Sequence, residues 1–203
     1  MLSKGHKRKQ QIIDTAKDMF IKNGFQSTHI GNVCEVLNIA RGTVYQYFKN
    51  KREILYAVFD SVEEQIDDVL DHDELKELLK KSASQKAILK LINDRIISCI
   101  TPVINEPIAV QLIFRDIKGI DDGVVLRVNK FIDFITKLVM SDIEEMIKKG
   151  FCKKGVRADV TAAMLIGGLF FVIHNYQKRA DDTLSREIIE TLVGNHLKST
   201  LKS

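Results

Sequence analysis

The stretch "STHIGNVCEVLNIARGTVYQYFKNKREIL", residues 27–55, has the spacing of a helix, a tight turn and a second helix. Ile30, Val33 and Cys34 follow the i, i+3, i+4 spacing of one face of the first helix. We expect this helix to end near Asn38, because asparagine tolerates the left-handed backbone that a tight turn needs. This order of elements is that of a helix-turn-helix motif.

The second helix of the motif, over residues 40–48, has an apolar face and a polar face. Val44 and Phe48 are four residues apart and therefore point together toward a core. The other side carries hydrogen-bonding side chains, namely Arg41, Thr43, Gln46 and Tyr47. Gly42 has no Cβ and allows close approach to a partner surface. Arginine and glutamine can read guanine and adenine in a major groove, so we expect this face to bind DNA. An amphipathic protein-contact helix is the alternative.

Basic residues are concentrated in the first quarter of the chain. Residues 1–52 contain ten Lys or Arg and three Asp or Glu, whereas the remaining 151 residues carry 21 basic and 24 acidic side chains. A basic head on a mildly acidic body favours a polyanionic partner for the head alone, although a solvated basic arm is another interpretation. One cluster at the start of the chain would form an arm that adds salt-sensitive affinity: Lys4, Lys7, Arg8 and Lys9.

The rest of the chain is also predicted to be helical. It contains only two prolines, and no β-branched run alternates with period two. Apolar spacing predicts helices over residues 8–23, 51–70, 86–101, 106–117, 123–149, 158–179 and 185–200. We expect an all-α chain in two domains, a three-helix head with the helix-turn-helix over residues 1–52 and a larger helical body over residues 53–203. The polar stretch 71–85 is the clearest break in the helical pattern.

Several kinds of chemistry have no candidate residues. Cys34, Cys99 and Cys152 are far apart and lack metal-ligand spacing, which makes a disulfide framework improbable and favours a reducing, cytoplasmic compartment. No signal-peptide segment follows the basic start, and the longest apolar run, residues 162–173, is too short to span a bilayer. Neither a nucleophile motif nor a glycine-rich phosphate loop is present. We therefore expect no enzyme activity, no metal and no cofactor.

Residues 27–55 resemble the DNA-binding head of the tetracycline-repressor (TetR) family. The matching positions are Thr28, Val33, Glu35, Ile39, Gly42, Thr43, Val44, Tyr45, Tyr47, Phe48, Asn50, Lys51 and Leu55. The preceding segment "IIDTAKDMFIKNGF" also resembles the first helix of that family. The departures from the family pattern are Cys34, Leu37, Asn38 and Ala40. The alanine lacks a hydroxyl that would cap the second helix of the motif and touch phosphate.

The resemblance implies a homodimer bound to a pseudo-palindromic operator in double-stranded DNA. The DNA contacts that it implies are Thr28, Arg41, Gly42, Thr43, Tyr45, Gln46, Tyr47 and Lys51. We expect Thr28 to act mainly as a helix cap, and Asn32 is a weaker candidate for a DNA contact. The family dimerises through its last two long helices, whose candidate interface residues here are Ala163, Gly167, Gly168, Ile189, Leu192, Val193 and His196. The alternative is that these residues pack inside one subunit.

The resemblance also implies that the body senses a small molecule. The candidate pocket residues are Phe114, Arg115, Phe131, Phe134, Phe170 and Tyr176. The aromatic members of this set could equally be ordinary core. A ligand that favours the DNA-incompetent conformation shifts the population away from DNA. We therefore expect a repressor released by a small hydrophobic effector such as an acyl-CoA. A ligand-independent or partner-controlled architectural DNA-binding protein is the alternative.

Overall fold

The computed structural model describes residues 3–70, 74–80, 84–114, 121–178 and 186–202. Within these ranges the chain is helical and forms no strand, although Cys152 and Leu201 make an isolated antiparallel bridge. The all-α fold expected from the sequence is confirmed. The helices are α1 (Lys4–Asn23), α2 (Ile30–Leu37), α3 (Arg41–Tyr45), α4 (Lys51–Val69), α5 (Glu74–Lys80), α6 (Gln85–Ile104), α7 (Pro107–Phe114), α8 (Asp122–Lys148), α9 (Ala158–Lys178) and α10 (Arg186–Thr200).

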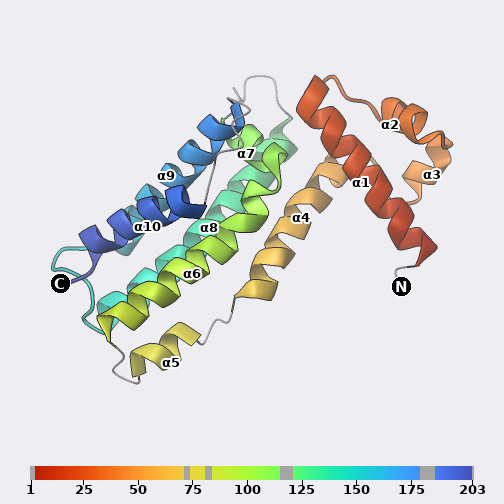
Figure 1. Cartoon of the computed structure of the whole chain (residues 1–203). Coiled ribbons are helices and arrows are strands. Elements are labelled where there is room, and N and C mark those ends of the chain that lie inside the picture. The colour runs from red at the N-terminus through yellow and green to blue at the C-terminus, as the bar shows by residue number, and fades with distance from the viewer. Residues whose placement is uncertain (1–2, 71–73, 81–83, 115–120, 179–185, 203) are drawn as a thin grey trace. The chain divides into compact units, whose positions relative to one another are not determined.

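The chain divides into two compact units, whose helices Figure 1 labels in chain order. Unit 1 comprises Met1–Glu63 and Pro107–Asn129, and unit 2 comprises Glu64–Glu106 and Lys130–Ser203. Helices α4 and α8 each contribute residues to both units. The helix-turn-helix head expected over residues 1–52 therefore lies in a larger unit that also contains α7 and parts of α4 and α8.

Helices α1, α2 and α3 pack around aromatic and aliphatic side chains in unit 1. The rings of Phe20 in α1 and Phe25 in the following turn lie 5.1 Å apart. Val33, Val44 and Phe48 are also buried. The apolar face predicted for the second helix of the motif is therefore part of a core.

Three helix ends follow from local chemistry. The Ser3 hydroxyl oxygen accepts a hydrogen bond from the His6 N–H at 3.2 Å, so α1 begins earlier than apolar spacing indicates. Gly24 ends α1 with a φ of 85°, a value that glycine adopts without steric cost. Asn38 ends α2 with a φ of 49° and is the one non-glycine residue with positive φ in the described part of the chain. The left-handed turn predicted at this asparagine is confirmed.

Unit 2 is built from α5, α6, α9, α10 and the later parts of α4 and α8. Helix α10 packs against both α6 and α9, and α5 packs against α6. The inward faces are largely aliphatic, with Ile88, Ile92, Ile100, Ile135, Ile143, Leu165, Leu169, Ile173, Ile189, Val193 and Leu197 among the buried side chains. The Lys153 N–H donates to the Thr200 carbonyl and the Lys202 N–H to the Phe151 carbonyl, both at 2.9 Å. These bonds fasten the end of α10 to the loop after α8.

Helix α9 is long and apolar enough to cross a membrane by length and composition alone. Its apolar character extends beyond the short run noted in the sequence, because the whole helix has 21 residues. The core helix of a soluble protein passes the same test. Leu165, Leu169 and Ile173 on one face of α9 are buried, and 33% of its apolar stretch is buried in this chain.

Candidate functional site

The helix-turn-helix motif consists of α2, a turn that begins at Asn38, and α3. The Ile39 N–H donates to the Cys34 carbonyl at 3.0 Å and closes the end of α2. Helix α3 is shorter than predicted because the chain tightens after it: the Tyr47 N–H donates to the Val44 carbonyl, three residues back, at 2.9 Å. The motif predicted from the spacing is confirmed, with a recognition helix of five residues.

The two faces of α3 and of the turn that follows it, residues 41–48, differ in exposure as the sequence predicts. Val44 and Phe48 are 0% and 3% exposed, whereas Tyr45 is 53% exposed. Among the other predicted DNA contacts, Arg41, Gly42 and Gln46 are exposed, and Thr43 and Tyr47 are half-buried. An exposed polar surface on a buried apolar base is a suitable reading face for a DNA groove.

Lys51, by contrast, is hydrogen-bonded within the head. Its Nζ donates to the carbonyls of Phe25 (2.7 Å), Gln26 (2.8 Å) and Thr28 (3.0 Å), and lies 4.7 Å from the centre of the Phe25 ring. An ammonium group has three donors, so these bonds use all of them. Burial lowers the pKa of Lys51, and the Asp121 carboxylate opposes this effect. A phosphate contact from Lys51 would therefore require internal hydrogen bonds to break.

Thr28 has a related structural role in the α1–α2 connection. Its side chain is 1% exposed, and its hydroxyl donates to the Gly24 carbonyl at 2.9 Å or the Met19 carbonyl at 3.2 Å. The N-cap of α2 is His29, one residue later than predicted, and the His29 N–H donates to the Asn32 side-chain oxygen at 3.0 Å. The buried Thr28 hydroxyl is neither the expected cap nor, in this conformation, accessible to phosphate.

Two glycines outside α3, Gly31 and Gly5, leave space for the side chains of Arg41 and Tyr47. A Cβ on Gly31 in α2 would lie 2.9 Å from Nη2 of Arg41, so the arginine rests against the bare backbone there. A Cβ on Gly5 in α1 would lie 3.6 Å from the Tyr47 hydroxyl. Sequence reasoning missed both positions, because the spacing within α3 does not reveal which part of another helix faces it.

The basic residues at the start of the chain are helical. Because α1 begins at Lys4, the predicted basic arm is replaced by the first turns of α1. Lys4, Lys7 and Lys9 are exposed there, and Arg8 is half-buried. Since Gly5 lies beside Tyr47, these charges occur near α3 and can contribute to a basic DNA-binding surface.

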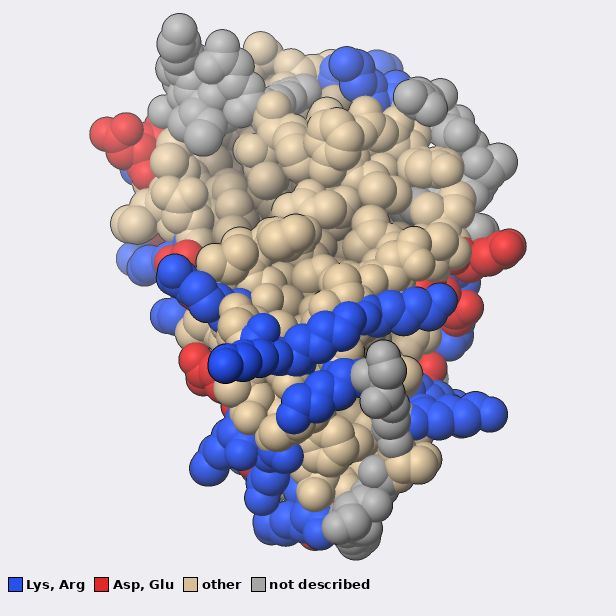
Figure 2. Space-filling view, turned by 90° about the vertical axis from the view of Figure 1, so that its left-hand side faces the viewer, with Lys and Arg blue, Asp and Glu red and all other residues tan. Residues whose placement is uncertain are grey.

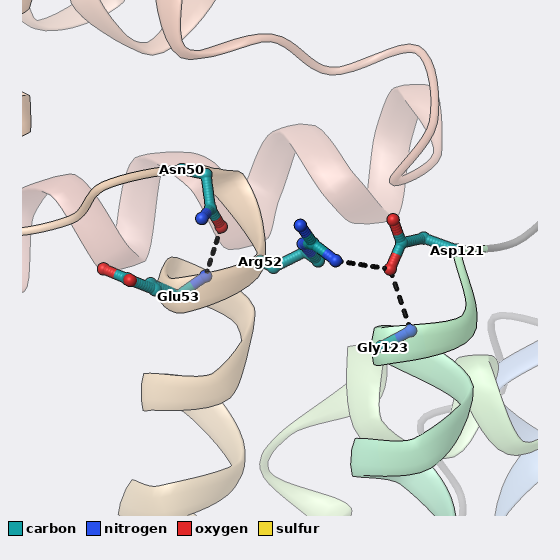
Figure 3. Close-up of polar contacts among 5 residues, drawn as sticks. All are labelled: Asn50, Arg52, Glu53, Asp121 and Gly123. Atoms are coloured by element: carbon teal, nitrogen blue, oxygen red, sulfur yellow. Dashed lines mark hydrogen bonds and ion pairs between the residues drawn. The ribbon is translucent and has the colours of Figure 1, made fainter.

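Two clusters of ion pairs join α4 to the beginning of α8 within unit 1. In the first, Nη1 of Arg52 donates to an Asp121 carboxylate oxygen at 3.0 Å, and the same oxygen accepts from the Gly123 N–H at 2.9 Å (Figure 3). The start of α4 is closed by the Asn50 side-chain oxygen, which accepts from the Glu53 N–H at 3.2 Å (Figure 3). The beginning of α8 is therefore tied to the helix that follows the DNA-binding motif.

The second cluster is centred on Arg127. Its guanidinium donates to Asp60 at 2.7 Å and to Glu63 at 2.8 Å, and lies 5.1 Å from the centre of the Phe59 ring. The arginine side chain is 11% exposed. One cation from α8 thus holds two carboxylates on successive turns of α4.

Unit 2 contains three neighbouring hollows that share Asp142 in their lining. The inner hollow, of about 40 Å³, is mainly aliphatic and is bordered by α4, α6, α8 and α9. The outer hollow, of about 250 Å³, lies between α5, α6 and α8 and has a mixed polar and apolar lining. The third, of about 20 Å³, is bordered by α6, α8, α9 and α10. Arg95 pairs with Asp142 through bonds of 3.1 and 3.3 Å and lines the inner and outer hollows.

The predicted pocket residues lie in different places. Phe134 lines the outer hollow. Phe131 and Phe170 are buried in unit 2, Phe114 is 38% exposed in unit 1, and Tyr176 is half-buried. Arg115 lies outside the described residues. Aliphatic side chains form most of the inner lining, and sequence reasoning missed them because aliphatic residues of a core and of a cavity follow the same spacing.

One side of unit 2 has an extended uncharged surface. Val160, Met164 and Phe171 of α9 are 46%, 67% and 58% exposed. Figure 2 views the side on which α9 and α10 lie in Figure 1 and shows a broad uncharged area with Lys and Arg gathered mainly below it. Of the predicted interface residues, Ala163 and Gly167 are exposed, Gly168, Leu192 and His196 are half-buried, and Ile189 and Val193 are buried.

Residues 12–58 match the family model described as "Bacterial regulatory proteins, tetR family". The chain is 27% identical over 195 residues to the "Fatty acid metabolism regulator protein" of Bacillus subtilis, covering 93% of this chain and 95% of the relative. It is 30% identical over 107 residues to the regulator TtgR of Pseudomonas putida, covering 52% of this chain and 51% of the relative.

Solved structures share the fold over most of the chain. The fatty acid degradation regulator FadR from Bacillus halodurans has a TM-score of 0.70 at 17% identity, with 94% of each chain covered. FadR from Bacillus subtilis, solved in complex with stearoyl-CoA, has a TM-score of 0.68 at 18% identity, with 94% of this chain and 98% of that chain covered.

An exposed recognition helix in a helix-turn-helix head, followed by an all-helical body, defines a class: the bacterial helix-turn-helix transcriptional regulators. Within that class, the chain belongs to the TetR family.

Proposed function

We propose that the protein is a homodimeric, cytoplasmic repressor that leaves a pseudo-palindromic operator when a small hydrophobic effector binds its body. The observation that carries this proposal is the exposed polar face of α3, which stands on the buried Val44 and Phe48. Arg41 and Gln46 read bases, and Tyr45 and Tyr47 contact phosphate oxygens.

The homodimer follows from the small size of the reading surface. One recognition helix covers too few base pairs for specific affinity, and two heads about 34–36 Å apart read two half-sites on one side of the duplex. The exposed apolar residues Val160, Met164 and Phe171 on α9 support a partner helix at this surface. Ala163 and Gly167 are small and exposed in the same helix, which permits close approach.

The effector is proposed to be a long-chain acyl compound. A relative covered over 95% of its length is named a fatty acid metabolism regulator, and a protein of the same fold was solved with stearoyl-CoA. A 100-fold loss of DNA affinity requires about 2.7 kcal/mol of coupling between the two sites. Helix α8 lines all three hollows and also carries Arg127, which holds α4.

A ligand-independent DNA-binding protein is the second candidate. The inner hollow of about 40 Å³ supports it, because ligand pockets usually measure about 300–1,000 Å³. Under this alternative, acyl compounds would leave DNA binding unchanged. The effector proposal therefore requires unit 2 to open when the ligand binds.

Selection of bound duplexes from random DNA tests the proposal. We expect two inverted half-sites, loss of binding in Arg41→Ala, and release of the selected duplex by stearoyl-CoA. Failure to bind any duplex at low ionic strength would refute the DNA-binding assignment. Binding that no acyl compound weakens would favour the second candidate.

A further inference from the structure

We propose that the Arg95–Asp142 ion pair is a gate that selects effectors with an anionic head on an apolar chain. In this proposal the anionic group replaces Asp142 beside Arg95, and the three hollows merge into one pocket. The inference rests on the proposed function, in which unit 2 binds the effector.

The position of the pair supports this role. Arg95 and Asp142 both line the inner and outer hollows, and Asp142 also lines the third. The Arg95 side chain is 9% exposed and that of Asp142 is 26% exposed. Nε of Arg95 donates to one carboxylate oxygen at 3.1 Å and Nη2 to the other at 3.3 Å. The pair therefore forms part of the partition between a mainly aliphatic hollow and a hollow with a mixed polar and apolar lining.

The size of the hollows requires the partition to move. A volume of about 40 Å³ has room for only a few water molecules, since one needs about 10–15 Å³. The outer hollow, of about 250 Å³, lies directly across Arg95, Leu138 and Asp142, the three residues that line both spaces. Joining the existing spaces disturbs fewer packed side chains than opening a new cavity of the same size.

The chemistry of the pair selects the ligand. Separating Arg95 from Asp142 removes a carboxylate from a nearly buried guanidinium, which is unfavourable. A ligand carboxylate or phosphate restores the charge-assisted hydrogen bonds, whereas the hydroxyl of an alcohol does not restore the charge balance. Asp142, which is more exposed than Arg95, is the partner that can turn toward water.

The walls of the outer hollow suit an anionic amphiphile. Lys76 and Lys137 are exposed cations in its lining, and Glu145 is the carboxylate besides Asp142. Phe134 and Leu138 supply apolar surface beside these charges. Among the described residues of this lining, the cations Arg95, Lys76 and Lys137 outnumber the carboxylates Asp142 and Glu145, which favours an anion.

Equilibrium dialysis of the unmodified protein with radiolabelled dodecanoate, dodecanoyl-CoA and dodecanol tests the selectivity. We expect at least one anionic ligand to bind about tenfold or more tightly than dodecanol, the ratio that a charged hydrogen bond supplies. If dodecanoate binds, a carboxylate is sufficient as the anionic head. If only dodecanoyl-CoA binds, the phosphates of CoA are the anionic group that is recognised. Equal or tighter binding of dodecanol, or no binding of any ligand, would overturn the inference.

Two variants test the gate itself. Asp142→Asn removes the competing charge, so the anionic ligands should bind about tenfold more tightly while dodecanol changes little. Arg95→Gln should abolish the preference for anions over dodecanol. Asp94→Asn is the matched control, because Asp94 pairs at 3.5 Å with Arg186, whose side chain is 64% exposed, and lines none of the three hollows. An unchanged anion preference in both test variants would refute the gate.

Circular dichroism and thermal unfolding establish that each variant is folded. If Arg95→Gln does not fold, the dialysis series on the unmodified protein and on Asp142→Asn still decides the question. The test is independent of DNA. Anion-selective binding without operator release would refute the proposed function and leave the gate intact. Operator release by dodecanol as readily as by dodecanoate would refute the gate and leave the proposed function intact.

Discussion

Lys51 carries a positive charge at the start of α4, where the helix dipole disfavours a cation. The family resemblance implied that Lys51 contacts DNA. The three carbonyls of Phe25, Gln26 and Thr28 instead stabilise it from within the head. These carbonyls lie 23 to 26 residues away along the chain, so local spacing could not reveal them.

Replacing Lys51 with methionine should lower the free energy of unfolding by about 2 kcal/mol, because three carbonyls lose a charged donor. Urea unfolding followed by circular dichroism measures this change. Lys49→Met is the matched control: Lys49 is exposed, and its replacement should change stability by less than about 0.5 kcal/mol. Unchanged stability of Lys51→Met with a loss of operator affinity would identify Lys51 as a phosphate contact after all.

Gly31→Ala should weaken DNA binding without weakening the fold. The added methyl group would lie 2.9 Å from the Arg41 guanidinium and displace it, whereas alanine improves helix propensity by up to about 1 kcal/mol. We expect operator affinity, measured by fluorescence anisotropy, to fall about tenfold, within the range of one base contact. In an Arg41→Ala background the substitution should have no further effect. Equal losses in both backgrounds would exclude Arg41 as the cause.

Cys99, in the lining of the inner hollow, should make stability sensitive to alkaline pH. Burial raises the pKa of its thiol to about 11, from an ordinary value of 9.0, and Arg95 opposes the rise. The stabilisation is therefore complete below pH 9 and is lost as the pH rises toward 11. Between pH 8.5 and 11, unmodified protein should lose up to about 2 kcal/mol more stability than Cys99→Ala in urea unfolding. Parallel pH profiles for the two proteins would contradict this.

At the scale of helices, the sequence predicts most of the elements, and its errors have local causes. Long amphipathic helices such as α8 and α9 are predicted to within a residue or two of their ends. Helix α1 begins early because Ser3 caps it, and α3 ends early because its last turn tightens. Neither the Ser3 cap nor the tightened last turn of α3 can be recognised from the spacing of apolar residues. This spacing also could not predict the ion pairs between α4 and α8, which are far apart in sequence.

Arg127→Gln should loosen α8 from α4. The arginine is 11% exposed and its partner Glu63 is 26% exposed, but Asp60 is 69% exposed, so the expected loss of stability is about 1–3 kcal/mol, below that of a fully buried pair. The operator affinities with and without effector should also become more alike, as anisotropy titrations can measure. Arg157→Gln removes a fully exposed ion pair and serves as the control. An unaltered effector response in Arg127→Gln would rule out coupling through this cluster.

At the scale of the whole molecule, the sequence resemblance implied a dimer interface and an effector pocket. Several of the residues that it assigned to these two sites are buried inside the subunit or lie apart from one another. Ile189 and Val193 are buried within unit 2, whereas Met164 and Phe171 are exposed on α9. In a dimer, a helix can carry apolar residues both on the face that packs inside its own subunit and on the face that contacts the partner. The spacing of apolar residues does not distinguish these two faces. Only the packing of the subunit shows which of these apolar residues are buried and which stay exposed to a partner.

Met164→Glu should convert the proposed dimer to a monomer, because it places a charge within the exposed apolar surface of α9. Sedimentation velocity should show the change in mass, and operator affinity should fall about 100-fold or more as one head loses its partner. Leu126→Glu is the control, since Leu126 is 56% exposed on α8 in unit 1. A Met164→Glu protein that remains dimeric would exclude this surface as the interface.

Gly123 limits how this regulator can be recombined with its relatives. A side chain at this position would begin 2.8 Å from the Tyr56 hydroxyl, 3.0 Å from an Asp121 oxygen and 3.1 Å from Nη1 of Arg52. A chimera that grafts a foreign sensor onto this head must therefore inherit the glycine together with Asp121, or else rebuild Arg52 and Tyr56 to suit the donor. Swapping segments at this junction to build a biosensor therefore needs one of two paired exchanges, Gly123 with Asp121 or Arg52 with Tyr56.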